Sequence, residues 1–419
     1  MNYFKPISIS LSPNVQKDDL WLALNLIIRP WLWGKGEAIK KLENEFKEYL
    51  GVKYAVSFNS GRSSFYAILK SLNLPEGSEV LIQAFTCNAV PNPVLWANLK
   101  PVYVDCNKDD FNMDADNLRS KITINAKVVV VQHTFGLPAD MEKIRAVCAE
   151  FNLILIEDCA HSLGAEYDGI KVGSHSKAAF FSFSRDKIIS SVYGGIAVTN
   201  DEKIAKKLEE LQKSFGTPNP FWTLQQLLHP IILHYLILPI YNFLDLGKIL
   251  LVFSQMFHVL SKAVSWQEKR GQCPDYFPKA LPNALASLAL NQFGKLETFK
   301  IKRQYMADYY YSELLGTKFE LPEKFENRKS AFLRFTVKHK NANDIIYDAW
   351  HKQNILLGDW YTTPIAPFDT KVEEVGYVPG SCKNAEDLAK ITLNLPTHIN
   401  ISKTDAERIV NFLKKYNGK

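Results

Sequence analysis

Short apolar runs that are rich in β-branched residues recur through the first half of the chain. The seven runs span residues 54–58, 80–83, 102–105, 128–132, 153–157, 179–183 and 195–199. Amphipathic stretches with helical spacing lie between several of them, at 63–72, 141–151 and 201–213. Strands that alternate with helices predict a mostly parallel, seven-stranded sheet covered on both faces, with a ligand site at the carboxyl ends of the strands.

The two ends of the chain follow other patterns. The first residues, as far as Gly36, look like an extended arm that leads into a helix at 37–50. Beyond residue 290 the spacing predicts a helix to residue 315, a strand at 332–337 and helices at 342–353 and 404–415. We therefore predict three parts, which are an N-terminal arm (1–40), a large domain (41–299) and a smaller C-terminal α+β domain (300–419).

The segment 214–261 differs from the rest of the chain because it contains only two formally charged residues, Asp245 and Lys248. Pro230 and Pro239 interrupt its apolar runs, so a membrane-spanning helix is the least favoured interpretation. Two interpretations remain. An insertion of about 214–272 packs on its own protein or on a partner subunit, which we favour slightly, or the segment makes a peripheral contact with a membrane surface.

Composition narrows the possible functions. The formal net charge of +6 is modest, and basic residues alternate with acidic ones, which gives nucleic-acid binding little support and favours a small anionic substrate. The six cysteines form no C-x-x-C pair and no metal-ligand pattern, so we expect reduced thiols and no metal site. The first residues lack the features of a signal peptide, so we expect a cytoplasmic protein, with membrane association as the alternative.

An acid and an amine follow two of the predicted strands. Asp158 ends the run at 153–157, and Lys187 lies between the run at 179–183 and Gly194-Gly195. Pyridoxal phosphate (PLP) needs a carboxylate for its pyridinium nitrogen and a lysine that forms a Schiff base. Taken alone, the lysine is more often a surface charge and the aspartate more often a helix N-cap. Their joint position favours a PLP site.

A third motif, Ser60-Gly61-Arg62-Ser63, lies between a predicted strand and a predicted helix. Backbone N–H groups at a helix N-terminus bind anions, and a glycine lets a phosphate approach closely. An ordinary capped helix start explains this motif equally well when it is taken alone.

In chain order, the motifs of this sequence resemble those of the DegT/DnrJ/EryC1/StrS family of sugar aminotransferases, which are PLP enzymes with the aspartate aminotransferase fold. The resemblance covers nearly the whole chain except 214 to about 272. The motifs that carry it are GVKYAV (51–56), SGRS (60–63), KPVYVD (100–105), GLPADM (136–141), EDCAHSLGA (157–165), the stretch from Ser182 to Lys187, and LNLPTH (393–398).

The resemblance implies a PLP-dependent transferase fold and a role for each matching residue. Lys187 would form the Schiff base and shuttle the proton, Asp158 would pair with the ring nitrogen, and His161 would lie near the ring oxygen. The positions that match the phosphate site are Gly61, Arg62, Ser63 and Ser182. The family further implies an amino-acid donor such as glutamate, a nucleotide-linked keto sugar as acceptor, and a homodimer with active sites at the subunit interface.

Lysine rather than histidine at position 187 favours amino transfer over the dehydration that some members catalyse. Alternatives are another PLP reaction, such as dehydration or racemisation, and a non-catalytic protein of the same fold that docks on a membrane or a partner.

The sequence departs from the family pattern at two motif positions. Cys87 stands where many members carry an aromatic residue that stacks on the ring, and Phe85 is a candidate replacement. The stretch 276–283 lacks the usual element that reaches the phosphate of the neighbouring subunit. The segment 358–364, with Trp360 and Tyr361, either lines the substrate pocket or forms a structural aromatic pair.

Overall fold

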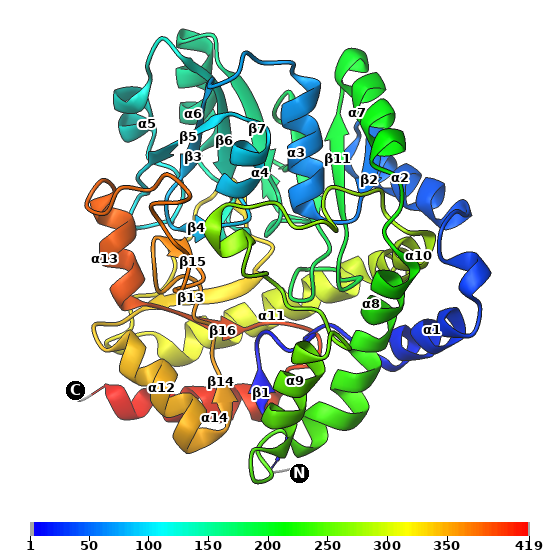
Figure 1. The fold of residues 1–419 in the computed structure, drawn as a ribbon. Coiled ribbons are helices and arrows are strands. Elements are labelled where there is room, and N and C mark those ends of the chain that lie inside the picture. Colours follow the sequence, from blue (N-terminus) through cyan, green and yellow to red (C-terminus); the bar gives the residue numbers. More distant parts are fainter. Residues whose placement is uncertain (1–3, 418–419) are drawn as a thin grey trace.

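The computed structural model describes residues 4–417, and a seven-stranded sheet forms its centre (Figure 1). The strands, in spatial order, are β2 (Tyr54–Phe58), β11 (Gly195–Thr199), β10 (Ala178–Ser182), β7 (Ile154–Asp158), β6 (Ala126–Gln132), β3 (Glu79–Gln83) and β5 (Lys100–Val104). β11 runs antiparallel to both of its neighbours, and the other paired strands are parallel. The predicted mostly parallel sheet is therefore confirmed, with strand ends within two residues of the predicted ones.

Helices cover both faces of this sheet. Successive side chains of a strand point to opposite faces, and here both faces are apolar. In β6, Val128 and Val130 pack with α3 (Gly61–Ser71) and α7 (Glu202–Phe215). Val129 and Val131, which alternate with these residues along β6, lie on the opposite face. There they join a second apolar layer with α2 (Glu37–Leu50), α6 (Met141–Glu150) and α10 (Asn283–Phe293).

The first forty residues differ from the expected extended arm, because they contain helix α1 (Lys17–Ile27). The Asp19 carboxylate accepts a hydrogen bond from the backbone N–H of Gln16 at 2.9 Å, which satisfies a donor at the start of the helix. α1 then packs on α8 (Pro220–Ile232) and α10 through buried residues that include Leu20 and Leu26. Before it, β1 (Ile7–Ser8) pairs in parallel with β14 (Ile355–Leu356).

The C-terminal part is built on its own apolar cluster. Its antiparallel pair β13 (Arg334–Lys338) and β16 (Thr392–Pro396) packs against α11 (Leu296–Leu314), α12 (Ala342–Gln353) and α14 (Lys403–Leu413). The predicted boundary at residue 300 falls inside α11, and the division into domains stays a prediction. The shorter elements are β4 (Thr86–Cys87), α4 (Pro91–Trp96), α5 (Ala115–Lys121), β8 (Glu166–Tyr167), β9 (Ile170–Lys171), β12 (Arg328–Lys329), β15 (Ile365–Ala366) and α13 (Lys383–Ile391).

The apolar insertion is helical. α8 (Pro220–Ile232) continues through a π-helical turn (Leu233–Ile237) and a short 3-10 turn, and α9 (Leu246–Met256) follows. α8 packs on α1 and α10 of the same chain (Figure 1). α9, by contrast, has exposed apolar side chains, among them Val252 and Met256. The stretch Pro220–Ile240 has the length and composition of a membrane span, which core helices of soluble proteins can also have, and 39% of its apolar window is buried inside the protein.

Candidate active site

The carboxyl ends of β7 and β10 bring the predicted acid and amine into one pocket. Asp158 is the last residue of β7, and Lys187 lies in the loop between β10 and β11. A pocket of about 130 Å³ opens between them. Six of the seven predicted site residues line it: Gly61, Arg62, Asp158, His161, Ser182 and Lys187.

The seventh predicted residue, Ser63, does not line this pocket. Its hydroxyl donates a hydrogen bond to Asn59 at 2.7 Å, and its backbone N–H donates to the Ser60 side chain at 3.0 Å. Ser60 is thus the N-cap of α3, and the hydroxyl of Ser63 is occupied inside the protein. Ser63 therefore lies behind the pocket wall, and its place in a phosphate site stays a prediction.

Lys187 is enclosed by apolar and aromatic side chains. Burial lowers the pKa of its ammonium group, and the nearby Asp186 carboxylate opposes that shift. Its Nζ lies 4.5 Å from the centre of the Trp360 ring. A lowered pKa increases the fraction of neutral amine, which is the form that attacks a carbonyl carbon.

The Asp158 carboxyl is buried, and burial raises its pKa to about 6, although the Ala160 N–H and the charge of Lys187 act in the opposite direction. The backbone N–H of Ala160 donates to it at 2.9 Å. No helix begins after Asp158, so the alternative that it is a helix N-cap is wrong. Its raised pKa would fall again beside a cationic partner.

The neighbouring acid, Glu157, has a structural role on the other side of β7. Its carboxylate accepts hydrogen bonds from the N–H groups of Gly173 and His175 at 2.7 and 2.9 Å, and from the Ser176 hydroxyl at 2.9 Å. The ring of His133 lies 3.1 Å away. His133, Glu157 and Cys159 have the spacing of a metal-ligand group. These hydrogen bonds already occupy the carboxylate and fix the end of the strand that carries Asp158.

The His161 ring is buried between aromatic residues. It stacks on Trp360 with centroids 5.1 Å apart and an interplanar angle of 17°. Burial lowers its pKa far below the usual value, and the charges of Lys187 and Arg334 act in the same direction. Because the N–H of Phe135 donates to Nδ1 at 3.3 Å, the proton of the neutral ring lies on Nε2.

The N-terminus of α3 forms a cradle for an anion. The N–H groups of Gly61 and Arg62 are in the first turn of the helix, where no helical carbonyl is available to them. A Cβ at position 61 would lie 2.9 Å from the Cβ of Ser182, so glycine keeps the approach open. With the Ser182 hydroxyl beside them, these groups offer the donors that a phosphate needs.

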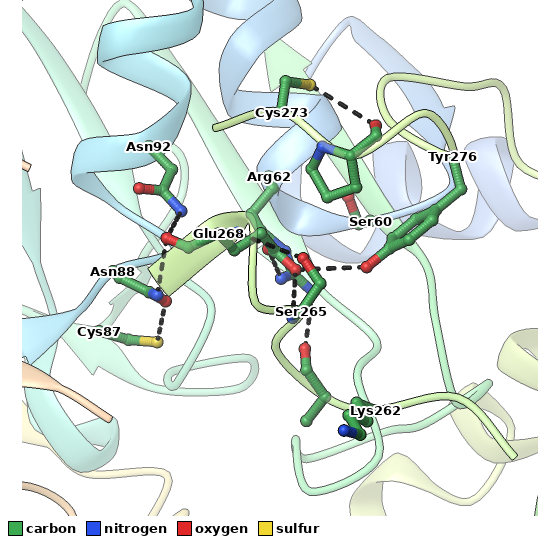
Figure 2. Close-up of polar contacts among 12 residues, drawn as sticks. Ser60, Arg62, Cys87, Asn88, Asn92, Lys262, Ser265, Glu268, Cys273 and Tyr276 are labelled. Carbon is green, nitrogen blue, oxygen red and sulfur yellow. Dashed lines mark hydrogen bonds and ion pairs between the residues drawn. The ribbon is translucent and has the colours of Figure 1, made fainter. Parts of the chain in front are cut away.

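The Arg62 side chain itself is turned toward a different partner, which the sequence did not suggest. Its guanidinium forms an ion pair with the fully buried carboxylate of Glu268, from the loop after the insertion (Figure 2). Glu268 also accepts hydrogen bonds from the Ser265 N–H at 2.9 Å and from the Tyr276 hydroxyl at 3.4 Å. The Phe277 ring stacks on the guanidinium at 4.6 Å. The stretch 276–283, which lacks the family element that reaches the neighbouring subunit, therefore packs on its own chain.

The aromatic ring in the pocket comes from the C-terminal part of the chain. Phe85, the candidate replacement for the stacking residue, is fully buried against Phe111 and does not line the pocket. Trp360 and Tyr361 both line the pocket and are stacked on each other. The segment 358–364 is therefore both part of the pocket wall and a structural aromatic pair. The guanidinium carbon of Arg334 lies 3.5 Å from the centre of the Trp360 ring. Sequence patterns gave no signal for Arg334.

Comparison with known proteins agrees with this geometry. The fold and the site define the class of the protein, which is an aminotransferase with a mostly parallel α/β core. A sequence model of the DegT/DnrJ/EryC1/StrS aminotransferase family matches residues 16–226 and 262–414, and the chain belongs to that family. The unmatched segment, 227–261, is shorter than the insertion expected from the sequence.

Individual relatives resemble the chain over nearly its whole length. It is 26% identical over 402 residues to GDP-perosamine synthase of Caulobacter vibrioides, covering 95% of each chain. It is also 26% identical over 400 residues to a UDP-N-acetyl-3-dehydro-alpha-D-glucosamine 3-aminotransferase of Acidithiobacillus ferrooxidans, covering 95% of this chain and 94% of the relative. Among solved structures, DesV of S. venezuelae in complex with a ketimine intermediate has a TM-score of 0.75 at 21% identity, covering 96% of this chain and 95% of that one.

Proposed function

We propose that this aminotransferase uses PLP to move an amino group from an amino acid, such as glutamate, to a keto sugar linked to a nucleotide. The observation that carries the proposal is the pairing of Lys187, whose pKa is lowered, with Asp158, whose pKa is raised, in one pocket beside an anion cradle. The sugar acceptor is supported by the two relatives, one named as a synthase of GDP-perosamine and the other as an aminotransferase of a UDP-linked sugar.

The pocket residues fit PLP. The N–H groups of Gly61 and Arg62 and the Ser182 hydroxyl would hold its phosphate, and the raised pKa of Asp158 marks a buried carboxyl that lacks a cationic partner. When bound, PLP supplies an aldehyde that condenses with amines and a pyridine ring that accepts electrons from the neighbouring carbon. The Asp158 carboxylate would keep the ring nitrogen protonated.

Lys187 would move the proton. In the first half of the reaction its neutral Nζ would take the proton from the α-carbon of the amino-acid donor and pass it to the C4′ carbon of the cofactor. In the second half the same nitrogen would take a proton back from C4′ and deliver it to the sugar carbon that receives the amino group. Trp360, which lies over Lys187, and the walls of the pocket would exclude water from this exchange.

Isotope transfer tests the proposal. Wild-type protein and Lys187→Ala are incubated with PLP, ¹⁵N-glutamate and a panel of nucleotide-linked keto sugars, and the products are analysed by mass spectrometry. We expect ¹⁵N in the sugar with wild type only, and no lysine-bound cofactor absorbance in Lys187→Ala. Loss of water from the sugar without ¹⁵N would identify a dehydratase instead, and failure to bind PLP would favour a non-catalytic protein.

We also propose a homodimer, as the family resemblance implies, and a cytoplasmic location, which is the expectation from the sequence. Light scattering on the purified protein tests the dimer, since a single species of monomer mass would contradict it.

A further inference from the structure

A second cavity adjoins the pocket of Lys187 and extends toward the insertion. It has a volume of about 360 Å³ and shares Ser184, Asp186 and Trp360 with that pocket. We call it the outer cavity. Its walls are the loop before Lys187, the helices of the insertion and the segment 359–368, and its residues include Arg185, His229, Leu233, Leu251 and Phe368.

Arg185 is a buried cation without an ion-pair partner in the part of the chain that the structure describes. It is 8% exposed, its guanidinium donates to the Ser261 hydroxyl at 2.6 Å, and its Nε has no acceptor. The carboxylate of the adjacent Asp186 pairs with Arg334 at 3.4 Å. The Tyr193 ring, whose centre lies 5.4 Å from the guanidinium carbon, gives Arg185 a cation–π contact, but a buried guanidinium normally has an anionic partner as well. Arg62, by contrast, has Glu268.

His229 supplies a second unpaired group from another element. This residue of α8 is 2% exposed, and neither ring nitrogen has a hydrogen-bond partner among residues 4–417. Burial and the nearby charge of Arg185 lower its pKa, so the ring is neutral and carries one N–H donor. Buried polar groups are nearly always paired, and two unpaired ones in the wall of one cavity indicate a missing ligand.

We propose that Arg185 and His229 form a subsite for the diphosphate of the acceptor substrate, an inference that rests on the proposed function. A guanidinium and an imidazole N–H are both donors that suit phosphate oxygens. The donor carboxylate does not suit this place, because it is attached to the carbon that loses its proton and must lie beside Lys187. The diphosphate of a linked sugar is one sugar ring farther out, where the outer cavity lies.

The rest of the outer cavity suits the nucleoside or lipid group that is attached to the diphosphate. Leu233, Leu251 and Phe368 line it and suit a flat base or an apolar lipid chain. His229, Leu233 and Leu251 all lie within 227–261, the segment that the family model does not match. The proposed subsite therefore gives a role in acceptor recognition to a segment that the family model does not cover.

Binding measurements test the subsite without requiring turnover. PLP-loaded wild type, Arg185→Gln, His229→Phe and the control Arg270→Gln are titrated calorimetrically with UDP, GDP and farnesyl diphosphate. Arg270 is exposed, pairs with Glu374 at 3.0 Å and does not line the outer cavity. We expect at least one diphosphate to bind, about tenfold to hundredfold more weakly in Arg185→Gln and about threefold to tenfold more weakly in His229→Phe. The control should match wild type.

The three ligands distinguish whether the sugar is linked to a nucleotide or to a lipid. Preference for UDP or GDP identifies a nucleotide and preference for farnesyl diphosphate a lipid, and either result supports the subsite. Equal binding by all variants, or no diphosphate binding to wild type, would overturn it. Weaker PLP binding in Arg185→Gln would also overturn it, by assigning Arg185 to the cofactor phosphate.

The glutamate half-reaction, followed by the absorbance of the bound cofactor, separates this inference from the proposed function. If wild type carries out the half-reaction but all variants bind diphosphates equally, only the subsite is wrong. If wild type carries out no half-reaction, the proposed function is wrong. A half-reaction slowed only in Arg185→Gln would place the donor carboxylate there and overturn the subsite.

Discussion

The ammonium nitrogen of Lys187 lies 4.5 Å from the centre of the Trp360 ring, and these residues are far apart in the sequence. The same ring stacks on His161 and lies 3.5 Å from the guanidinium carbon of Arg334. Trp360 therefore gathers the amine, the imidazole and a buried cation around one aromatic surface. It places an aromatic ring in the pocket, whereas Cys87 lines the same pocket without one.

Replacing Trp360 should weaken cofactor binding. An aromatic contact contributes about 0.5–1.5 kcal/mol beyond its buried area, so we expect Trp360→Leu to bind PLP roughly threefold to tenfold more weakly. Absorbance titration measures this, with Trp21→Leu, at an exposed position on α1, as the control. Unchanged affinity in Trp360→Leu would show that the ring does not contact the cofactor.

Asp158 should make the stability of the cofactor-free protein depend on pH. Its pKa is raised in the folded protein to about 6 from 3.8, so the folded state holds the proton more tightly than the unfolded state does. The contribution of this group is therefore fully present below pH 4 and is lost as pH rises through 6. Above pH 6, cofactor-free Asp158→Asn should be more stable than wild type, by up to about 3 kcal/mol.

Urea unfolding at pH 5 and pH 7.5 measures that difference. Saturation with PLP should reverse the order of the two proteins, because the ring nitrogen then pairs with the carboxylate. A variant that is less stable than wild type at both pH values without cofactor would contradict the raised pKa.

Gly61 should be intolerant of a side chain. A Cβ there would lie 2.9 Å from the Cβ of Ser182, inside the contact distance of two carbon atoms. We expect Gly61→Ala to lose about 1–3 kcal/mol of PLP binding energy, because the cradle must open to admit the methyl group. Gly34→Ala is the matched control, since nothing lies within 4 Å of its Cβ. Equal PLP affinity in both variants would argue against phosphate binding at α3.

Breaking the pair between Arg62 and Glu268 should destabilise the protein. Removing one partner leaves a buried charge without compensation, which costs about 3–5 kcal/mol, so we expect a large loss for Glu268→Gln. The double variant Arg62→Gln/Glu268→Gln should recover part of that loss, because neither charge remains. Chemical denaturation gives the values, and additive losses in the double variant would show that the two residues are not coupled.

The sheet could be predicted from the sequence because its strands are short apolar runs separated by amphipathic helices. Helix α1 was not predicted, because its sequence shows no clear amphipathic period. Trp21 and Ile28 are exposed while Leu20 and Leu26 are buried, so apolar residues occur all around the helix and hide its period.

The candidate site was predictable only where a motif follows a strand. Asp158, Lys187 and Gly61 were found in this way, since the ends of neighbouring strands meet at one edge. Glu268 and Arg334 come from distant segments and contact Arg62 and Trp360, which line the pocket, and no local pattern shows such long-range contacts.

The attachment of Glu268 to Arg62 has a consequence for any shortening of this chain. The stretch that follows the apolar segment carries the counterion of the helix that bears the anion cradle. A deletion within 227–261 would have to keep Glu268 in place, because its displacement would leave the Arg62 guanidinium buried without a counterion. Excision of the apolar segment is thus constrained by a contact that lies outside it.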